Sequence, residues 1–305
     1  MQHNGADSYR FYLSVSVRVA SGGNMKESKQ KYNRISKHQI ESIEIQLSER
    51  DKAVLLSVFT CRYLTTGQIK RLHYKTSTSD LAAMRAANRG VLKLKDMGLI
   101  VSLKRRIGGV RAGSGSYVWS VTAAGLKVLN IIKSVEKAEA RKRIFEPSPS
   151  FLEHTLAVAE AYIQLNEIAR CEAVELVNAE LEPKCWRQYT SRSGALAYLK
   201  PDLYAVIGNE DYEDHYFFEI DKGTEAPTRI IKKCMQYVGY YNFKKEKRKS
   251  EVFPYVVWIV PDVKRKDSLT DYISQSVSLK NIFVIITMDK LKDLVLEGVE
   301  GVIKL

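Results

Sequence analysis

Two apolar segments that carry carboxylates decide the fold expected for the second half of this chain. The first is Pro201-Asp202-Leu203-Tyr204-Ala205-Val206-Ile207, and the second is Tyr216-Phe217-Phe218-Glu219-Ile220-Asp221-Lys222. Both segments predict strands, in which successive side chains point to opposite faces. Glu219 and Asp221 would therefore share one face, and pairing of the two strands would place Asp202 beside Glu219.

Carboxylates placed side by side repel each other unless a positive charge lies between them, and a divalent cation is the simplest such charge. The two strands therefore predict a site for Mg²⁺ or Mn²⁺, held by Asp202, Glu219 and Asp221. Such a site is typical of metal-assisted phosphodiester cleavage. The competing interpretation is that these residues are solvated carboxylates at strand ends.

The segments around these strands predict the rest of a mixed α/β domain. An amphipathic helix is expected over 151–170, and a strand over 174–181. After the carboxylate strands, a helix is expected over 228–243, followed by a very apolar strand at 255–260 that is typical of burial on both faces. Another helix, a buried strand at 282–287 and a final helix complete the order.

The helix at 151–170 carries Glu153, His154 and Glu160. Either glutamate could complete the acidic cluster of the two strands. A lone histidine on an amphipathic helix is more often a hydrogen-bonded structural residue than a ligand, and we interpret His154 in that way.

Composition indicates a globular protein of a reducing compartment. Hydrophobic residues make up 45% of the chain. No run of about 18 apolar residues occurs, so we expect no membrane span. The N-terminus lacks the apolar core of a signal peptide. The four cysteines are scattered without a CxxC pair, which predicts neither a zinc site nor a disulfide framework. We therefore expect a cytoplasmic protein.

The positive charge of the chain is concentrated in its first half. Residues 1–150 contain 27 Lys and Arg against 11 Asp and Glu, whereas residues 151–305 contain 21 against 24. Solubility alone does not require this asymmetry. The basic half is therefore the candidate for contact with a polyanion.

The basic half has the pattern of a winged helix. Three helices are expected between residues 48 and 98, each beginning near a Ser or Thr that can cap it. Strands follow at 99–103 and 117–121, on either side of a basic, glycine-rich turn. Three helices and then a β-hairpin is the order of a winged helix, in which the third helix is the recognition element.

The third helix and the turn supply the candidate DNA-binding residues. Arg85, Arg89 and Lys93 recur every four residues and so share one helix face, with Asn88 close by. The turn adds cations placed to reach phosphates: Lys104, Arg105, Arg106 and Arg111. We therefore predict binding to double-stranded DNA. The competing interpretation is a solvated helix face, since many winged helices bind protein instead.

These observations divide the chain into four parts. Residues 1–46 are expected to form a disordered basic arm, and residues 47–134 the winged-helix domain. Residues 135–150 are a charged linker that ends in Pro147-Ser148-Pro149-Ser150, where two prolines among serines are expected to break any helix. Residues 151–305 form the second domain.

The order of elements after residue 150 resembles the restriction-endonuclease-like core, whose PD-(D/E)xK signature is matched at Pro201-Asp202 and at Glu219. Residues 48–290 as a whole resemble the replication-relaxation family of plasmid and mobile-element proteins. The specific part is Glu219-Ile220-Asp221-Lys222-Gly223-Thr224, and the family pattern also has a Lys and a Tyr on the following helix, here Lys233 and Tyr237. The resemblance implies a role in relaxing or processing plasmid DNA for replication.

One position departs from the nuclease pattern. Asp221 stands where the nuclease lysine is expected, and Lys222 comes one residue late on the opposite face. We expect Lys233, on the next helix, to return an ammonium group to the site and to stabilise the charge that develops on the phosphate. The competing interpretation is an exposed helix lysine beside Arg229 and Lys232.

Three functional hypotheses follow. The leading one is a DNA-binding protein of a plasmid or other mobile element with metal-dependent nicking activity. The second is a non-catalytic DNA-binding regulator or accessory factor whose nuclease-like domain is degenerate. The third is a winged-helix adaptor that docks a replication or relaxase protein.

Overall fold

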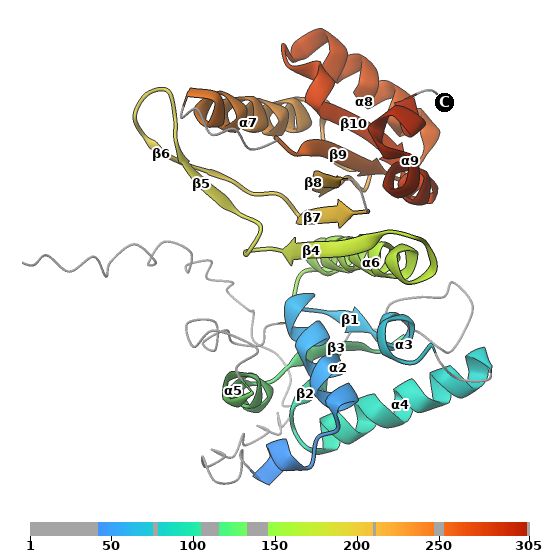
Figure 1. Ribbon diagram of the computed structural model, residues 1–305. Coiled ribbons are helices and arrows are strands. Elements are labelled where there is room, and N and C mark those ends of the chain that lie inside the picture. The colour runs from blue at the N-terminus through green and yellow to red at the C-terminus, as the bar shows by residue number, and fades with distance from the viewer. Residues whose placement is uncertain are drawn as a thin grey trace, which may run out of the picture. The chain divides into compact units, whose positions relative to one another are not determined.

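The computed structural model describes the following residues (Figure 1): 42–75, 79–104, 116–132, 146–209, 212–246 and 253–303. The predicted arm over 1–46 lies outside these ranges except at its end, where residues 42–45 are helical. Three of the predicted DNA-binding residues also lie outside the described residues: Arg105, Arg106 and Arg111.

Capping side chains set the helix starts in the N-terminal part, as the sequence predicts. Helix α2 (Glu49–Thr60) follows Ser48, whose hydroxyl accepts a hydrogen bond from the Asp51 amide while the Asp51 carboxylate accepts one from the Ser48 amide. Thr65 begins α3 (Thr66–His73) with the same reciprocal arrangement. Each pair satisfies two backbone donors that the helix itself leaves free.

A third helix, α4 (Asp80–Asp96), begins after the capping residue Ser79. The described residues of the N-terminal part also contain three short strands and one more helix: β1 (Leu64–Thr65), β2 (Ile100–Ser102), β3 (Val118–Val121) and α5 (Ala123–Ile131). The strands form an antiparallel sheet in the order β1-β3-β2. Strand β1 was not predicted from the sequence, because two residues give no alternation and only pairing with β3 makes them a strand.

A five-stranded mixed sheet forms the frame of the C-terminal part, in the order β10-β9-β8-β7-β4. Its strands are β4 (Glu175–Leu181), β7 (Leu203–Gly208), β8 (Glu213–Ile220), β9 (Tyr255–Val260) and β10 (Phe283–Thr287). The pairs β4–β7 and β7–β8 are antiparallel, whereas β8–β9 and β9–β10 are parallel. The predicted α/β class with a mixed sheet is therefore confirmed.

Helices pack against this sheet and bury its strands. They are α6 (Pro149–Cys171), α7 (Pro227–Glu246), α8 (Val263–Ser276) and α9 (Leu291–Ile303), with single 3₁₀ turns at Lys280–Ile282 and Met288–Lys290. One core joins α7 and α8 to the sheet through Tyr237, Phe217 and Trp258, all almost fully buried. Helices α6 and α9 contact each other and the sheet, α6 at β4 and α9 at β10.

The start of α6 corrects one expectation. The two prolines of the 147–150 segment were expected to break any helix, but Pro149 is the first residue of α6 and Ser148 is its N-cap. Proline is well tolerated there because the first helical amide has no intrahelical acceptor. The predicted linker thus ends at a helix start.

The segment between β4 and β7 also differs from expectation. Its sequence is polar and aromatic and predicts no strand. It forms an antiparallel hairpin of β5 (Arg187–Thr190) and β6 (Leu196–Leu199), separate from the main sheet. Alternation over four residues is too short to reveal such strands in a sequence.

Helix α6 also contacts the N-terminal part, and residues 36–305 form one compact unit. Gln68 of α3 donates to the Leu156 carbonyl, 3.1 Å away, and the guanidinium of Arg71 contacts Glu160 and Glu167. The two predicted domains therefore share a polar contact along α6.

None of the helices in the described ranges combines the length and apolar character that a membrane span requires.

Candidate active site

Asp202 lies at the centre of the candidate site, immediately before β7 rather than within it. Its Oδ2 accepts a hydrogen bond of 2.8 Å from the Ile220 amide at the end of β8. Its Oδ1 lies 3.2 Å from His154 Nε2 on α6. Only 5% of Asp202 is exposed, so the strand ends and α6 hold this carboxylate within the protein.

Glu219 lies on β8 and is more deeply buried, with 1% exposed. The ammonium group of Lys233 and the hydroxyl of Tyr237, both on α7, donate to its two carboxylate oxygens. Lys233 Nζ also lies 3.9 Å from Asp202 Oδ1. Lys233 and Tyr237 are four residues apart, so they share the face of α7 that meets the sheet. The expected return of an ammonium group from α7 is thus observed in the geometry.

Burial and charge perturb the titration of every member of this group. Burial raises the pKa of Glu219 to about 8, aided by the charge of Asp202 and opposed by Lys233. For Asp202, burial is outweighed by the His154 hydrogen bond and the charge of Lys233, so its pKa is lowered. The hydrogen bond to Asp202 raises the pKa of His154. Burial opposes the charge of Lys233, but the two carboxylates prevail and raise its pKa.

These side chains line an open pocket of about 400 Å³. The pocket is formed by the start of α6, the ends of β7 and β8, the loop that follows β8, and α7. Its polar lining includes His154, Asp202, Glu219 and Lys233, with Trp258 as an aromatic wall. The Lys233 ammonium lies 6.0 Å from the centre of the Trp258 ring. Perturbed acidic and basic groups that meet in a pocket are typical of an active site.

Asp221 does not join this group, contrary to expectation. It follows the last residue of β8, and its Oδ2 accepts a hydrogen bond of 2.6 Å from Arg265 on α8. Its Oδ1 accepts from the Gly223 amide at 2.9 Å, in a turn where Gly223 has φ +77°. Asp221 thus fixes the loop after β8 to α8. Among the described residues, no three His, Cys, Asp or Glu side chains lie close enough together to hold a metal ion.

The two glutamates of α6 that were predicted to complete the acidic cluster also lie away from the carboxylate pair. The Glu160 carboxylate pairs with Arg71 on α3, and Glu153 Oε2 lies 2.5 Å from Lys222 Nζ. Neither glutamate lines the pocket with Asp202 and Glu219. His154 is hydrogen-bonded, as interpreted, but its partner is a site carboxylate. Nothing in the local pattern indicated this, because the contact depends on how α6 packs on the sheet.

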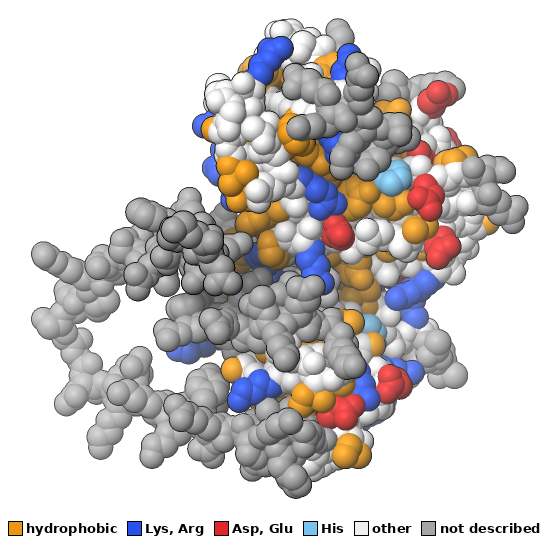
Figure 2. Space-filling model, turned by 60° about the vertical axis from the view of Figure 1, so that its left-hand side comes forward, with side chains coloured by type: hydrophobic (Ala, Val, Ile, Leu, Met, Phe, Trp, Pro, Cys, Tyr) orange, Lys and Arg blue, Asp and Glu red, His pale blue; other side chains and the backbone are white. Residues whose placement is uncertain are grey.

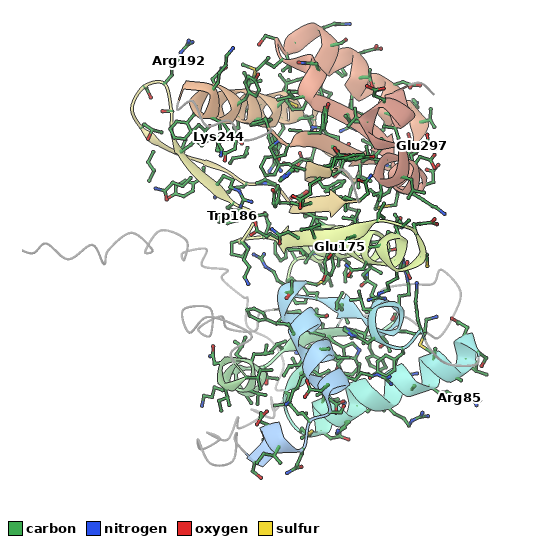
Figure 3. The ribbon with its side chains drawn as sticks, in the orientation of Figure 1. Arg85, Glu175, Trp186, Arg192, Lys244 and Glu297 are labelled. Atoms are coloured by element: carbon green, nitrogen blue, oxygen red, sulfur yellow. The ribbon has the colours of Figure 1, made fainter. Side chains whose placement is uncertain are left out.

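The candidate DNA-binding residues fall into two groups. Arg85, Asn88 and Arg89 are exposed on α4, and neither arginine has an ion-pair partner among the described residues (Figure 3 labels Arg85). Lys93 instead contacts Asp51 at 2.6 Å, where it braces the start of α2. The exposed Lys104 lies at the end of the described part of the turn.

The fold and the pocket define an α/β protein with a charged pocket at the ends of two antiparallel strands. The chain belongs to the replication-relaxation family, whose model matches residues 55–256. The match includes helices α3 and α4 and all four members of the Asp202–Glu219–Lys233–His154 group. No curated protein and no solved structure matches the chain. Membership of the family points to a role in the replication of plasmids or other mobile elements.

Proposed function

We propose that this protein binds double-stranded DNA of a plasmid or other mobile element and nicks it at the pocket that contains Asp202, Glu219 and Lys233. The observation that carries the proposal is the meeting of two buried carboxylates and an ammonium group from three separate segments. Burying charged groups costs free energy, and a well-packed core does not require charged groups. Their arrangement is better explained by chemistry on a phosphodiester.

Asp202 and Glu219 are suited to hold a divalent metal, whereas Asp221 is not. Mg²⁺ is usually bound by one or two carboxylates together with water and phosphate oxygens, so a third protein ligand is not required. Asp202 and Glu219 line the same pocket, whereas Asp221 does not line it and its two oxygens are held by Arg265 and the Gly223 amide. When bound, Mg²⁺ or Mn²⁺ would polarise the phosphate and lower the pKa of an attacking water.

The remaining groups have roles that follow from their positions. Lys233 holds a positive charge where negative charge develops on the phosphate. His154 lines the same pocket, and its raised pKa favours the protonated form that can donate a proton to a leaving oxygen. Tyr237 is buried and donates to Glu219, so it fixes the orientation of that carboxylate.

In the same proposal, the N-terminal part acts as a winged helix and α4 meets the duplex. The succession of α2, α3 and α4 before the β2–β3 pair supports this role. Arg85 and Arg89 are exposed and four residues apart, so both can reach one DNA backbone. Lys93 has a structural role instead, because Asp51 holds its ammonium group.

The nicking proposal is tested with supercoiled plasmid and Mg²⁺ or Mn²⁺, using the wild type, Asp202→Asn and Asp267→Asn. Asp267 is an exposed residue of α8 and serves as the matched control. We expect nicked circles from the wild type and the control, and none from Asp202→Asn. Thermal unfolding with millimolar Mn²⁺ should show stabilisation that Asp202→Asn loses. No shift and no nicking in the wild type would favour the non-catalytic regulator.

Duplex binding is tested by replacing Arg85 and Arg89 together with alanine, with Lys127→Ala as the control. Lys127 is exposed on α5. The double variant should bind duplex DNA more weakly. Its plot of log affinity against log salt should be less steep, with a slope smaller in magnitude by about 2, because two fewer phosphates are neutralised. Weak, salt-insensitive binding by the wild type would instead support the adaptor hypothesis.

A further inference from the structure

The hairpin between β4 and β7 carries a charge unlike that of the part of the chain around it. Residues 184–200 contain four cations and no Asp or Glu: Lys184, Arg187, Arg192 and Lys200. By contrast, residues 151–305 as a whole contain more acidic than basic residues. Figure 3 shows the hairpin extending from Trp186 near its base to Arg192 at its far end.

Alternation gives the hairpin an inner and an outer face. Tyr189 and Leu199 are buried in the core beneath α7. The guanidinium carbon of Arg187 lies 4.8 Å from the centre of the Tyr204 ring, and its Nη2 lies 2.8 Å from Glu180 Oε2. These contacts anchor the inner face. The strand register places Tyr198 opposite Gln188, on the other face.

The outer face combines aromatic rings with a cation. Tyr198 is 46% exposed, and Lys200 Nζ lies 4.4 Å from the centre of the Trp186 ring and 6.0 Å from that of Tyr198. The ammonium group therefore lies near both rings. Figure 2, which brings this side of the molecule forward, shows basic side chains interspersed with hydrophobic ones on its upper part.

The base of the hairpin adjoins the candidate active site. Lys200 precedes Pro201-Asp202 directly, and the Cys185 thiol lies 3.0 Å from the Pro201 carbonyl, to which it donates. Trp186 Nε1 donates to Glu182, at 3.4 Å.

We propose that the outer face of the hairpin binds single-stranded nucleic acid. Bases stack on Trp186 and Tyr198, and the phosphates are met by Lys184, Lys200 and Arg192. Aromatic rings interspersed with cations suit a single strand, because its bases are free to stack whereas those of a duplex are not. The absence of carboxylates within 184–200 favours a polyanion over a partner of mixed charge. This binding surface is separate from α4 and does not require cleavage.

Intrinsic fluorescence provides a direct test. The chain has three tryptophans, and Trp119 and Trp258 are each only 2% exposed, so the half-buried Trp186 is the most exposed of the three. Oligothymidylate of about twenty nucleotides should quench the wild-type emission and increase the anisotropy of a dye on the oligonucleotide. Trp186→Phe should retain binding but lose the quenching.

The affinity of each variant for oligothymidylate distinguishes the hairpin surface from other exposed aromatic residues. Trp186→Ala combined with Tyr198→Ala should weaken oligothymidylate binding by about tenfold or more. Tyr272→Ala is the matched control, because Tyr272 is a similarly exposed tyrosine on α8, at 45%. Circular dichroism checks that the double variant is folded. If the double variant is unfolded, the single variant Tyr198→Ala is measured in its place.

Three outcomes would overturn the proposal. The first is a wild type that does not bind oligothymidylate. The second is binding that survives in the aromatic variants but is lost when Lys184 and Lys200 become Ala, which would show an electrostatic patch without stacking. The third is binding that depends on Arg85 and Arg89 alone, which would place the single strand on α4. A wild type that does not nick plasmid would contradict the proposed nicking activity but would leave this binding proposal intact, because binding is measured without metal.

Discussion

The two parts of the molecule use charge in opposite ways. In the N-terminal part, the cations of α4 that carry our DNA-binding hypothesis are on the surface, and Arg85 and Arg89 are exposed. In the C-terminal part, the decisive charges are inside: Asp202, Glu219 and Asp221 are each at most 5% exposed. A surface charge requires no partner, whereas a buried charge requires a specific one. The difference explains which features could be inferred from sequence and which mutations should unfold the protein.

The largest effect is expected where a buried charge loses its partner. Lys233→Met keeps most of the side-chain volume but leaves Glu219 and Asp202 without their ammonium group. We expect a loss of about 3 kcal/mol in the free energy of unfolding. Lys232→Met is the control, because Lys232 is the exposed neighbour on α7 and should change stability by less than about 0.5 kcal/mol. Urea unfolding measures both variants, and equal effects would show that Lys233 is not essential to the pair.

The same contrast explains what sequence analysis achieved. The helix starts at Ser48, Thr65 and Ser79 were predictable because capping depends on residues within the same turn. The apolar strand at 255–260 was predictable because a continuous apolar run indicates burial on both faces. Both signals are local. Alternation along the two carboxylate segments is a local signal as well, and it predicts that Asp202 lies beside Glu219.

The rest of the site depends on partners that are distant in sequence. Alternation predicts that Asp221 shares a strand face with Glu219, but Asp221 follows the end of β8, and Arg265, 44 residues later, binds its carboxylate. His154 reaches Asp202 only because α6 packs beside the ends of β7 and β8. Neither pairing has a spacing or a motif that indicates it. The hairpin was missed for a different reason, since its two strands are too short to show a period.

The response to pH should also distinguish the two parts. Burial lowers the pKa of His73, on α3, to about 4. As the pH falls, His73 therefore takes up a proton in the unfolded chain at a higher pH than in the folded protein. The stability contributed by His73 is present above about pH 6.5 and is lost toward pH 4. Glu219 acts in the opposite direction. Its raised pKa gives a contribution that is present below about pH 4.5 and lost as the pH rises through about 8.

His73→Gln isolates the acid-side effect. The wild type should lose about 2 kcal/mol more than the variant between pH 6.5 and pH 4, less than the full shift implies because His73 is partly exposed. Urea unfolding at several pH values measures this difference. Parallel curves for the two proteins would mean that His73 accepts a proton in the folded state without cost, and its hydrogen bond to Ser57 would then not require the neutral ring.

The smallest effect on stability is expected at the exposed cations of the N-terminal part. Arg85→Ala combined with Arg89→Ala should change the free energy of unfolding by less than about 0.5 kcal/mol, because neither side chain loses a buried contact. Arg71→Ala is the informative comparison within the same part. Arg71 contacts Glu160 and Glu167 and is partly buried, so its loss should cost about 1 kcal/mol.

The value of this comparison is that stability and DNA affinity should separate. If α4 is a binding surface, the Arg85 and Arg89 variant weakens duplex binding while its unfolding curve stays on that of the wild type. Arg71→Ala should do the reverse, lowering stability with little effect on affinity, because its guanidinium faces α6 rather than solvent. A double variant at Arg85 and Arg89 that is markedly unstable would contradict the assignment of surface charge to binding. It would mean that α4, like the pocket, uses its cations to hold the fold together.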